Sequence, residues 1–270
     1  MAKQDAAGLV DTARYPLFDL DAEPAATVIA DAHRQLRKTG ACELAGFVAD
    51  HGLGALVAEA ERLAPLAHHS SGRATAYLSP PPPDVGPGNP KAWTGRFGVG
   101  AVAYDLFPDD SLIRALYEWD PLLRFVERIL GIGPIYRYGD PFGALNLAVM
   151  EDGEELQWHF DQTDFVVSLA LQDATEGGDF EVAPRIRRPG DERYGDVAMV
   201  LDGDRRRVVT LPLTPGTLLV FAGRHSLHRV TPVKGGSRLV ALLAYDTKPG
   251  TVGTPELQMS RYGRTADGAT

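Results

Sequence analysis

The stretch Leu156-Gln-Trp-His-Phe-Asp161 decides how the rest of the sequence is interpreted. Its residues alternate strictly, and successive side chains of an extended strand point to opposite faces of a sheet. The leucine, tryptophan and phenylalanine therefore share one face, whereas Gln157, His159 and Asp161 share the other. An imidazole and a carboxylate on the same face can bind one metal ion together. A His-x-Asp pair on a solvent-facing strand has no such meaning, so the interpretation depends on finding further ligands.

Residues 221–230, which read Phe-Ala-Gly-Arg-His-Ser-Leu-His-Arg-Val, contain the candidate third ligand. His228 lies 67 residues after Asp161. Together with His159 and Asp161 it would form the facial triad of non-haem Fe(II) oxygenases, in which two imidazoles and one carboxylate leave other coordination positions open for reactants. His225 is the alternative third ligand, but it belongs to the opposite strand face, so His228 is preferred.

Arg238 follows ten residues after His228. If Lys234-Gly-Gly236 forms a three-residue hairpin loop, Pro232 lies opposite Arg238, and the side chains of His228 and Arg238 face the same side. They are then roughly 13 Å apart along the strands, at ~3.3 Å per residue. A small dicarboxylate that binds the metal at one end can pair at its other end with the planar guanidinium of Arg238. The alternative is an exposed arginine after a tight turn.

The composition limits the class of protein. The chain has 270 residues, of which 44% are hydrophobic and 23% charged, as is ordinary for a globular protein. The net charge of −9 argues against a surface that neutralises phosphates, so a small-molecule substrate is expected and nucleic acid is not. Cys42 is the only cysteine, which excludes a disulfide framework and fits a reducing cytoplasm. No signal peptide or membrane-spanning run is apparent, so no membrane partner is expected, and the oligomeric state is left open.

The first half of the chain has mainly helical periodicity. Apolar residues recur at helical spacing in residues 21–38, 51–66 and 109–130, the last segment being broken into two helices at Asp120-Pro121. A strand is expected over residues 41–48, and loose order over the first fourteen residues.

Two segments between these helices are expected to be loops. His68 and His69 would face opposite ways on a strand, which favours a solvated loop over a metal site. Residues 79–90 contain six prolines and two glycines and predict a long surface loop, which can cover a site.

The second half consists of short β-rich segments separated by turn signals, which is typical of an all-β sandwich or barrel. The predicted strands are 134–138, 143–150, 156–161, 165–172, 179–183, 196–201, 206–212, 217–222, 226–231 and 238–246. We therefore predict a mainly β fold with N-terminal helices. It forms a single domain, 1–270, in which a mainly helical portion (1–130) packs on a cupin-like jelly-roll core (131–250), followed by a C-terminal tail (251–270).

The segment His159-Phe-Asp161, followed by His228 and Arg238, resembles the Fe(II)/2-oxoglutarate-dependent dioxygenase superfamily, whose fold is a double-stranded β-helix. More narrowly, the segments Tyr138-Gly-Asp-Pro-Phe-Gly-Ala-Leu-Asn146, Gly177-Gly-Asp-Phe-Glu-Val-Ala-Pro184 and Gly223-Arg-His-Ser-Leu-His-Arg-Val-Thr-Pro232 are similar to the free-amino-acid radical halogenases and their hydroxylase relatives. The resemblance implies Fe(II) at the triad, 2-oxoglutarate as cosubstrate with Arg238 on its distal carboxylate, and O2 as oxidant. The halogenases replace the carboxylate ligand by a small residue. Because this sequence keeps Asp161, the resemblance implies hydroxylation or another oxidation.

Three residues are candidates for binding the reactants. Arg96 lies where the amino-acid-modifying relatives place a carboxylate-binding arginine, and Asp140 can meet a substrate ammonium group. Asn146 is a candidate for the cosubstrate. For each of them a turn or surface role is an equal alternative, and no catalytic side chain beyond the metal ligands is assigned.

Rival functions follow from the same residues. Two histidines and a carboxylate also serve catalytic zinc in hydrolases, but a hydrolase gives no reason for Arg238. A non-catalytic cupin-like binding protein is a second rival. Desaturation, epimerisation or cyclisation by the same cofactors is a third, and the sequence does not separate it from hydroxylation.

Overall fold

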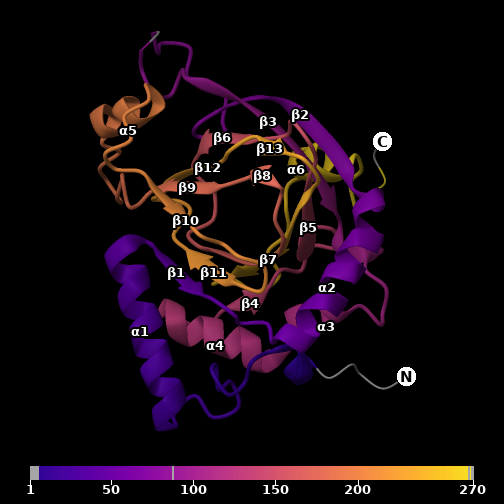
Figure 1. The fold of residues 1–270 in the computed structure, drawn as a ribbon. Helices are drawn as coiled ribbons and strands as arrows, with labels where there is room; N and C mark the ends of the chain where they lie inside the picture. The colour runs from indigo at the N-terminus through magenta and orange to yellow at the C-terminus, as the bar shows by residue number, and fades with distance from the viewer. Residues whose placement is uncertain (1–5, 87, 267, 269–270) are drawn as a thin grey trace.

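The computed structural model describes residues 6–86, 88–266 and 268, and Figure 1 shows a ring of strands with helices packed against its outside. The strands are β1 (Ala41–Leu44), β2 (His68–Thr75), β3 (Thr94–Val102), β4 (Tyr136–Arg137), β5 (Leu145–Met150), β6 (Leu156–His159), β7 (Val166–Gln172), β8 (Glu176–Gly177), β9 (Phe180–Ala183), β10 (Val209–Leu211), β11 (Leu218–Phe221), β12 (Leu227–Val230), β13 (Val233–Lys234), β14 (Arg238–Leu243) and β15 (Tyr245–Asp246). Eleven of them form one antiparallel sheet in the order β1-β11-β7-β14-β5-β3-β6-β12-β9-β10, with β2 paired to β3. The predicted jelly roll with N-terminal helices is confirmed.

The helices are α1 (Glu23–Thr39), α2 (Asp50–Leu63), α3 (Leu112–Glu118), α4 (Asp120–Leu130), α5 (Tyr194–Leu201) and α6 (Pro255–Tyr262), with 3-10 turns η1 (Ala6–Leu9), η2 (Ala64–Leu66) and η3 (Tyr104–Leu106). Local signals set several ends. Gly40 and Gly131 close α1 and α4 in the left-handed conformation, and the Ser111 side chain accepts from the Arg114 N–H in the first turn of α3. The predicted division into two helices is confirmed, with the break at Trp119, directly before Asp120-Pro121. Among the described residues, no helix is long and apolar enough to cross a bilayer.

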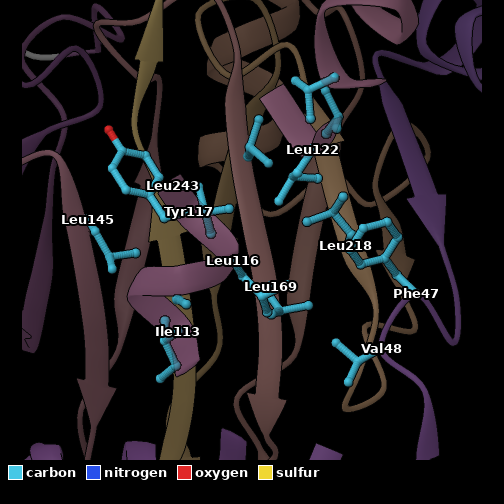
Figure 2. Close-up of a cluster of buried hydrophobic side chains, with 14 of the residues drawn as sticks. Phe47, Val48, Ile113, Leu116, Tyr117, Leu122, Leu145, Leu169, Leu218 and Leu243 are labelled. Atoms are coloured by element: carbon cyan, nitrogen blue, oxygen red, sulfur yellow. The ribbon is translucent and has the colours of Figure 1, made fainter. Parts of the chain in front are cut away.

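The outer face of the barrel packs against the N-terminal helices. Along β5, Leu145, Leu147 and Val149 belong to the large apolar core, because alternate residues of a strand share one face. Figure 2 shows leucines from β5, β7, β11 and β14 beside residues of α3 and α4. The opposite residues of each strand, such as Met150 and Phe221, form a second cluster that lines the barrel. Polar residues at the same alternate strand positions as Met150 and Phe221 therefore point into the barrel.

A β-bulge interrupts the alternation predicted for Leu156 to Asp161. His228 lies opposite His159 and Val230 lies opposite Leu156, so two residues of β6 face one residue of β12. Leu156 therefore packs with the inner cluster, whereas Trp158 stays in a separate outer cluster. The prediction that these two side chains share a face is wrong. His159 and Asp161 follow the bulge and keep their shared side.

Other local predictions are also corrected. Residues 196–201 form helix α5, although the run Val-Ala-Met-Val-Leu was predicted as a strand; a short apolar run is ambiguous between the two. His68 and His69 begin strand β2, so they are not in a loop. Leu9 and Val10 are buried, because the chain pairs with Val48, so the described part of the first fourteen residues is ordered; residues 1–5 lie outside the described residues.

The barrel sheet crosses the boundary predicted at residue 130. β2 and β3 come from the first 130 residues and nevertheless belong to the barrel sheet. The tail after residue 250 contains α6, which lies beside β2 and β3 (Figure 1). The proline-rich loop contains no helix or strand among its described residues, as predicted; Pro87 lies outside them.

Candidate metal centre and reactant site

Strands β6 and β12 bring the two predicted histidines together. His159 and His228 are direct register partners, and their ring centroids are 4.2 Å apart. Asp161 follows β6, where its backbone N–H donates to the Gly223 carbonyl at 3.2 Å. The Nε2 atoms of His159 and His228 lie 4.0 and 3.4 Å from the Asp161 carboxylate oxygens. One potential ligand atom from each residue lies within 4.8 Å of the others, which is close enough to share one ion.

Backbone carbonyls set the tautomer of both imidazoles. The Nδ1 atom of His159 is 2.7 Å from the carbonyl oxygen of Gln157, and that of His228 is 2.9 Å from the carbonyl oxygen of Ser226. Because a carbonyl only accepts hydrogen bonds, Nδ1 carries the proton in each ring and the Nε2 lone pair is free. This arrangement is the usual one for metal-binding histidines.

Electrostatics keep His159 neutral. Burial lowers the pKa of its imidazole to about 4; His228 adds to this shift, and Asp161 opposes it. The neutral imidazole is the form that binds a metal ion, so this residue is ready to act as a ligand at neutral pH.

The Asp161 carboxylate has an unfilled position. Its Oδ2 atom is buried, and within the described chain no hydrogen-bond donor contacts it. A buried carboxylate oxygen without a partner needs an explanation such as a bound ion. Gly223 faces it so closely that a Cβ atom there would collide with the carboxylate. The donor set, the tautomers and the unpaired oxygen therefore fit a divalent metal ion.

Arg238 provides a second unpaired charge inside the same barrel. It lies opposite Met150, which belongs to the inner cluster, and its side chain is buried. Burial lowers the pKa of its guanidinium to about 10, against the opposing effect of Asp173 and Asp179. Within the part of the chain that the structure describes, the Arg238 guanidinium makes no hydrogen bond and no ion pair within 4 Å. A buried guanidinium without a partner is suited to a carboxylate ligand.

The hairpin predicted for this segment is wrong. β12 pairs with β6 and β9, β14 pairs with β5 and β7, and Val233 and Lys234 pair with β8 instead of closing a loop between β12 and β14. Arg238 is nevertheless inside the barrel, because its own strand alternates between the outer core and the interior.

The comparison with protein families supports this interpretation. Residues 99–253 match the model of the family described as Halogenase D. The chain belongs to the halogenase D family. The predicted likeness to the Fe(II)/2-oxoglutarate-dependent dioxygenases is confirmed at the level of the family. No curated protein matches the sequence.

Solved structures share the fold of this family member. AviO1 from Streptomyces viridochromogenes Tue57 has 20% identity and a TM-score of 0.56, with 84% of this chain and 97% of that chain covered. A 2OG-Fe(II) oxygenase family oxidoreductase from Burkholderia pseudomallei has 20% identity and a TM-score of 0.53, with 83% and 92% covered. SnoN, a non-heme alpha ketoglutarate dependent epimerase from nogalamycin biosynthesis, has 19% identity and a TM-score of 0.54, with 82% and 83% covered. At these identities the likeness concerns the fold.

Asn146 lies inside the barrel of this halogenase D family member, but its side chain already makes two hydrogen bonds within the protein. It lies opposite Leu242 on the inner face of β5 and is buried. Its Nδ2 donates to the Phe142 carbonyl at 3.0 Å, and its Oδ1 accepts from the Tyr262 hydroxyl at 2.6 Å. One N–H of the amide remains for a ligand, so its role with the cosubstrate stays a prediction.

Asp140 has a structural position instead of a reactant-facing one. Its Oδ1 accepts from the backbone N–H groups of Phe142 and Gly143, each at 2.8 Å. Its Oδ2 accepts from the Gly253 N–H at 2.6 Å and the Gln258 side chain at 3.1 Å. Although burial raises the pKa of this carboxyl, these donors outweigh it and lower the pKa. Because Oδ1 is used within its own turn and Oδ2 holds the segment that leads into α6, the geometry does not support the predicted contact with a substrate ammonium group.

The structure does not bring Arg96 to the triad. Its neighbour Phe97 lies opposite Leu156, which packs with the inner cluster, so Arg96 points to the outside. Its side chain is 71% exposed, and its nearest acidic partner is Glu155 at 3.6 Å. His225, the alternative metal ligand, is also absent from the cluster of ligand atoms among the described residues.

Sequence reasoning missed the contribution of the C-terminal tail. The Thr254 side chain caps α6, Pro255 begins it, and Gly263 closes it in the left-handed conformation. This is the start-and-stop pattern of a short helix, and it was available in the sequence. Gly223 was also missed, because its role depends on a side chain 62 residues earlier in the chain.

Proposed function

We propose that this protein is an Fe(II)- and 2-oxoglutarate-dependent oxygenase that hydroxylates an unactivated C–H bond of a small molecule, a free amino acid or amino-acid derivative. The observation that carries the proposal is a pair of charged groups without partners within one barrel, the buried Oδ2 atom of Asp161 and the buried guanidinium of Arg238. The Asp161 carboxylate lies beside two correctly oriented imidazoles, and the Arg238 guanidinium lies on the inner face of β14. A metal ion and a dicarboxylate would satisfy both charges.

The protein groups have separate roles in this proposal. His159, Asp161 and His228 hold Fe(II), and the chemistry that the ion supplies with 2-oxoglutarate and O2 is oxidation of the substrate C–H bond. Arg238 pairs with the distal carboxylate of 2-oxoglutarate and fixes its direction in the barrel. The rings of Phe180 and Phe221 pack on His228, with centroids 5.5 and 5.0 Å away, and keep water from that side of the centre.

Asp161 favours hydroxylation over halogenation. The halogenases that the sequence resembles carry a small residue at the corresponding position, where a halide then binds. In this chain the Asp161 carboxylate faces both histidines, and we expect it to occupy that position when the metal is bound. Hydroxyl transfer is therefore the expected outcome.

A fold neighbour suggests one alternative within the same chemistry. SnoN is described as an epimerase. Epimerisation, desaturation and cyclisation differ from hydroxylation in how the substrate is held after its hydrogen is removed. The mass of the product separates them, because only hydroxylation adds one oxygen atom.

The test is a screen of L-amino acids with Fe(II), 2-oxoglutarate and O2 at high chloride. We expect succinate release that depends on 2-oxoglutarate and a product that gains one oxygen, with no chlorinated product. Reactions without 2-oxoglutarate and reactions with Zn(II) in place of Fe(II) are the controls. Activity with Zn(II) and no cosubstrate would support a hydrolase instead, and a chlorinated product from the unchanged protein would show that Asp161 does not occupy the coordination position.

A further inference from the structure

The proline-rich loop and the segment that leads into α5 meet around a cavity outside the barrel. The cavity has a volume of about 270 Å³ and is lined by Tyr77, Ser79, Pro82, Lys91, Glu192 and Tyr194. The Lys91 Nζ atom lies 5.2 Å from the centroid of the Tyr194 ring, so the end of the loop contacts the start of α5 (Figure 1). This volume is close to the lower limit of ~300 Å³ that is usual for small-molecule sites.

The cavity lies on the outer side of the segment that provides two of the candidate metal ligands. Phe160, between His159 and Asp161, belongs to the outer cluster with Trp158 and therefore points away from the barrel interior. The ring of Tyr77, which lines the cavity, packs on the ring of Phe160 with a centroid distance of 5.3 Å. The cavity is therefore close to the metal centre in the chain but is not part of the reactant site.

Both walls of the cavity contain a residue other than glycine in the left-handed conformation. Leu78 has a φ angle of 54° and separates two of the lining residues, and Arg193 has a φ angle of 47° and separates two others. Within the described ranges, Arg185 is the only further residue of this kind. A side chain with a Cβ atom is disfavoured in this conformation, above all a bulky one such as leucine, and such backbone strain is concentrated at ligand sites.

The polar groups that remain free in the cavity are donors. The Tyr77 hydroxyl is buried and has no hydrogen-bond partner within the described chain, which calls for an explanation such as a bound ligand. The Lys91 ammonium makes no ion pair within 4 Å among the described residues, and its pKa is raised, mainly by its hydrogen bond with the Tyr194 hydroxyl, so it keeps its charge. Glu192, the acidic residue of the lining, already pairs with Arg187 at 2.8 Å. An unpaired cation beside a free hydroxyl suits an anion.

We propose that this cavity is a second ligand site, which binds a small molecule through an oxyanion group, a carboxylate or a phosphate. The Lys91 ammonium and the Tyr77 hydroxyl donate to the oxygen atoms of the anion. Pro82 and the ring of Tyr194 provide apolar contacts for the remainder of the molecule, as is usual in small-molecule sites. The site uses neither iron nor 2-oxoglutarate, so the inference is independent of the proposed function.

The test is titration calorimetry of the metal-free protein with inorganic phosphate and with benzoate, which separate the two kinds of oxyanion. We expect saturable binding of at least one of them, at one site per chain. Lys91→Gln should lower its affinity by about 10- to 100-fold, the usual loss of a charge-assisted hydrogen bond. Lys248→Gln, which changes an exposed lysine outside the lining, should retain the affinity. Arg238→Gln should also retain it, because the guanidinium of Arg238 lies inside the barrel.

A second variant separates a ligand contact from a structural role. Tyr77→Phe keeps the ring on Phe160 and removes only the hydroxyl. Because that hydroxyl has no partner in the free protein, the free energy of unfolding without anion should not fall, whereas the affinity for the anion should fall by about 10-fold. Urea unfolding with and without the anion measures the first quantity.

Three results would overturn the proposal. The first is that neither anion binds the unchanged protein. The second is that binding is lost in Arg238→Gln or in Lys248→Gln, because the anion would then be bound elsewhere. The third is that Tyr77→Phe lowers the stability of the free protein and leaves the affinity unchanged, because the hydroxyl would then have a structural partner.

Discussion

Replacement of Gly223 by alanine should displace the Asp161 carboxylate. A Cβ atom at Gly223 would lie 2.8 Å from Cγ of Asp161 and closer still to Oδ2, whereas real Cβ contacts stay beyond 3.0 Å. The backbone of Gly223 is not in the left-handed region, so alanine itself is permitted there. The cost of the substitution therefore comes from the carboxylate and not from the backbone.

The size of the effect follows from this contact. Cγ must move by at least about 0.2 Å and Oδ2 by more, which exceeds the ~0.2 Å tolerance of metal–ligand distances. Mutation of residues that support metal ligands lowers metal affinity by ~10- to 100-fold, or about 1.4 to 2.8 kcal/mol. We expect Gly223→Ala to lower the Fe(II) affinity by at least this much. Without metal, the overpacked site should lower the free energy of unfolding by about 1 to 3 kcal/mol. Calorimetric titration of Fe(II) under argon and urea unfolding measure the two quantities.

A double-mutant cycle provides the control. In an Asp161→Gly background the carboxylate is gone, so Gly223→Ala should change the free energy of unfolding by no more than ~0.5 kcal/mol, as ordinary surface substitutions do. An equal cost in both backgrounds would refute the reasoning, because the strain would then lie elsewhere. Unchanged Fe(II) affinity in Gly223→Ala would refute the assignment of Asp161 as a ligand.

Three further predictions concern the other charged groups. Arg238→Gln should raise the KM for 2-oxoglutarate by about 10- to 100-fold and the KM for the primary substrate much less, as measured by succinate release; the reverse pattern would contradict the role. His228→Ala should abolish turnover while His225→Ala retains it, with circular dichroism to confirm the fold; loss only in the latter would move the role to His225. Because hydrogen bonds lower the pKa of Asp140, its contribution to stability is present above the unfolded-state pKa of ~3.9 and is lost as the pH falls through the folded-state pKa. Asp140→Asn should therefore remove part of the acid sensitivity of unfolding, and an unchanged pH profile would contradict this account.

The candidate metal ligands were accessible from the sequence because the arrangement of two of them depends on local alternation. His159 and Asp161 are separated by one residue, so they share a side whatever the remainder of the strand does. The bulge before His159 changes the direction of Leu156 but not of the two ligands. His228 was selected because it shares a strand face with Arg238, whereas the pairing of β6 with β12, which brings it beside His159, is not specified by that spacing.

The reactant-binding residues were not accessible in the same way. Arg96 lies on β3, whose inner and outer faces are defined by its pairing with both β5 and β6. The carboxylate of Asp140 is used by Gly253 and Gln258, more than 110 residues later in the chain. Contacts between such distant segments are set by tertiary packing, which the pattern of either segment alone does not specify.

Arg238 shows why a wrong pairing can still give a correct placement. The predicted hairpin with β12 does not exist, since β14 pairs with β5 and β7. The direction of the side chain depends on its own strand, in which Leu239 and Ala241 belong to the outer core. Alternation then places Arg238 in the barrel regardless of the partner strand. For this fold the sequence specifies which residues face the interior, while the identity of the neighbouring strand, and hence the distance between Arg238 and the triad, depends on how the whole barrel closes.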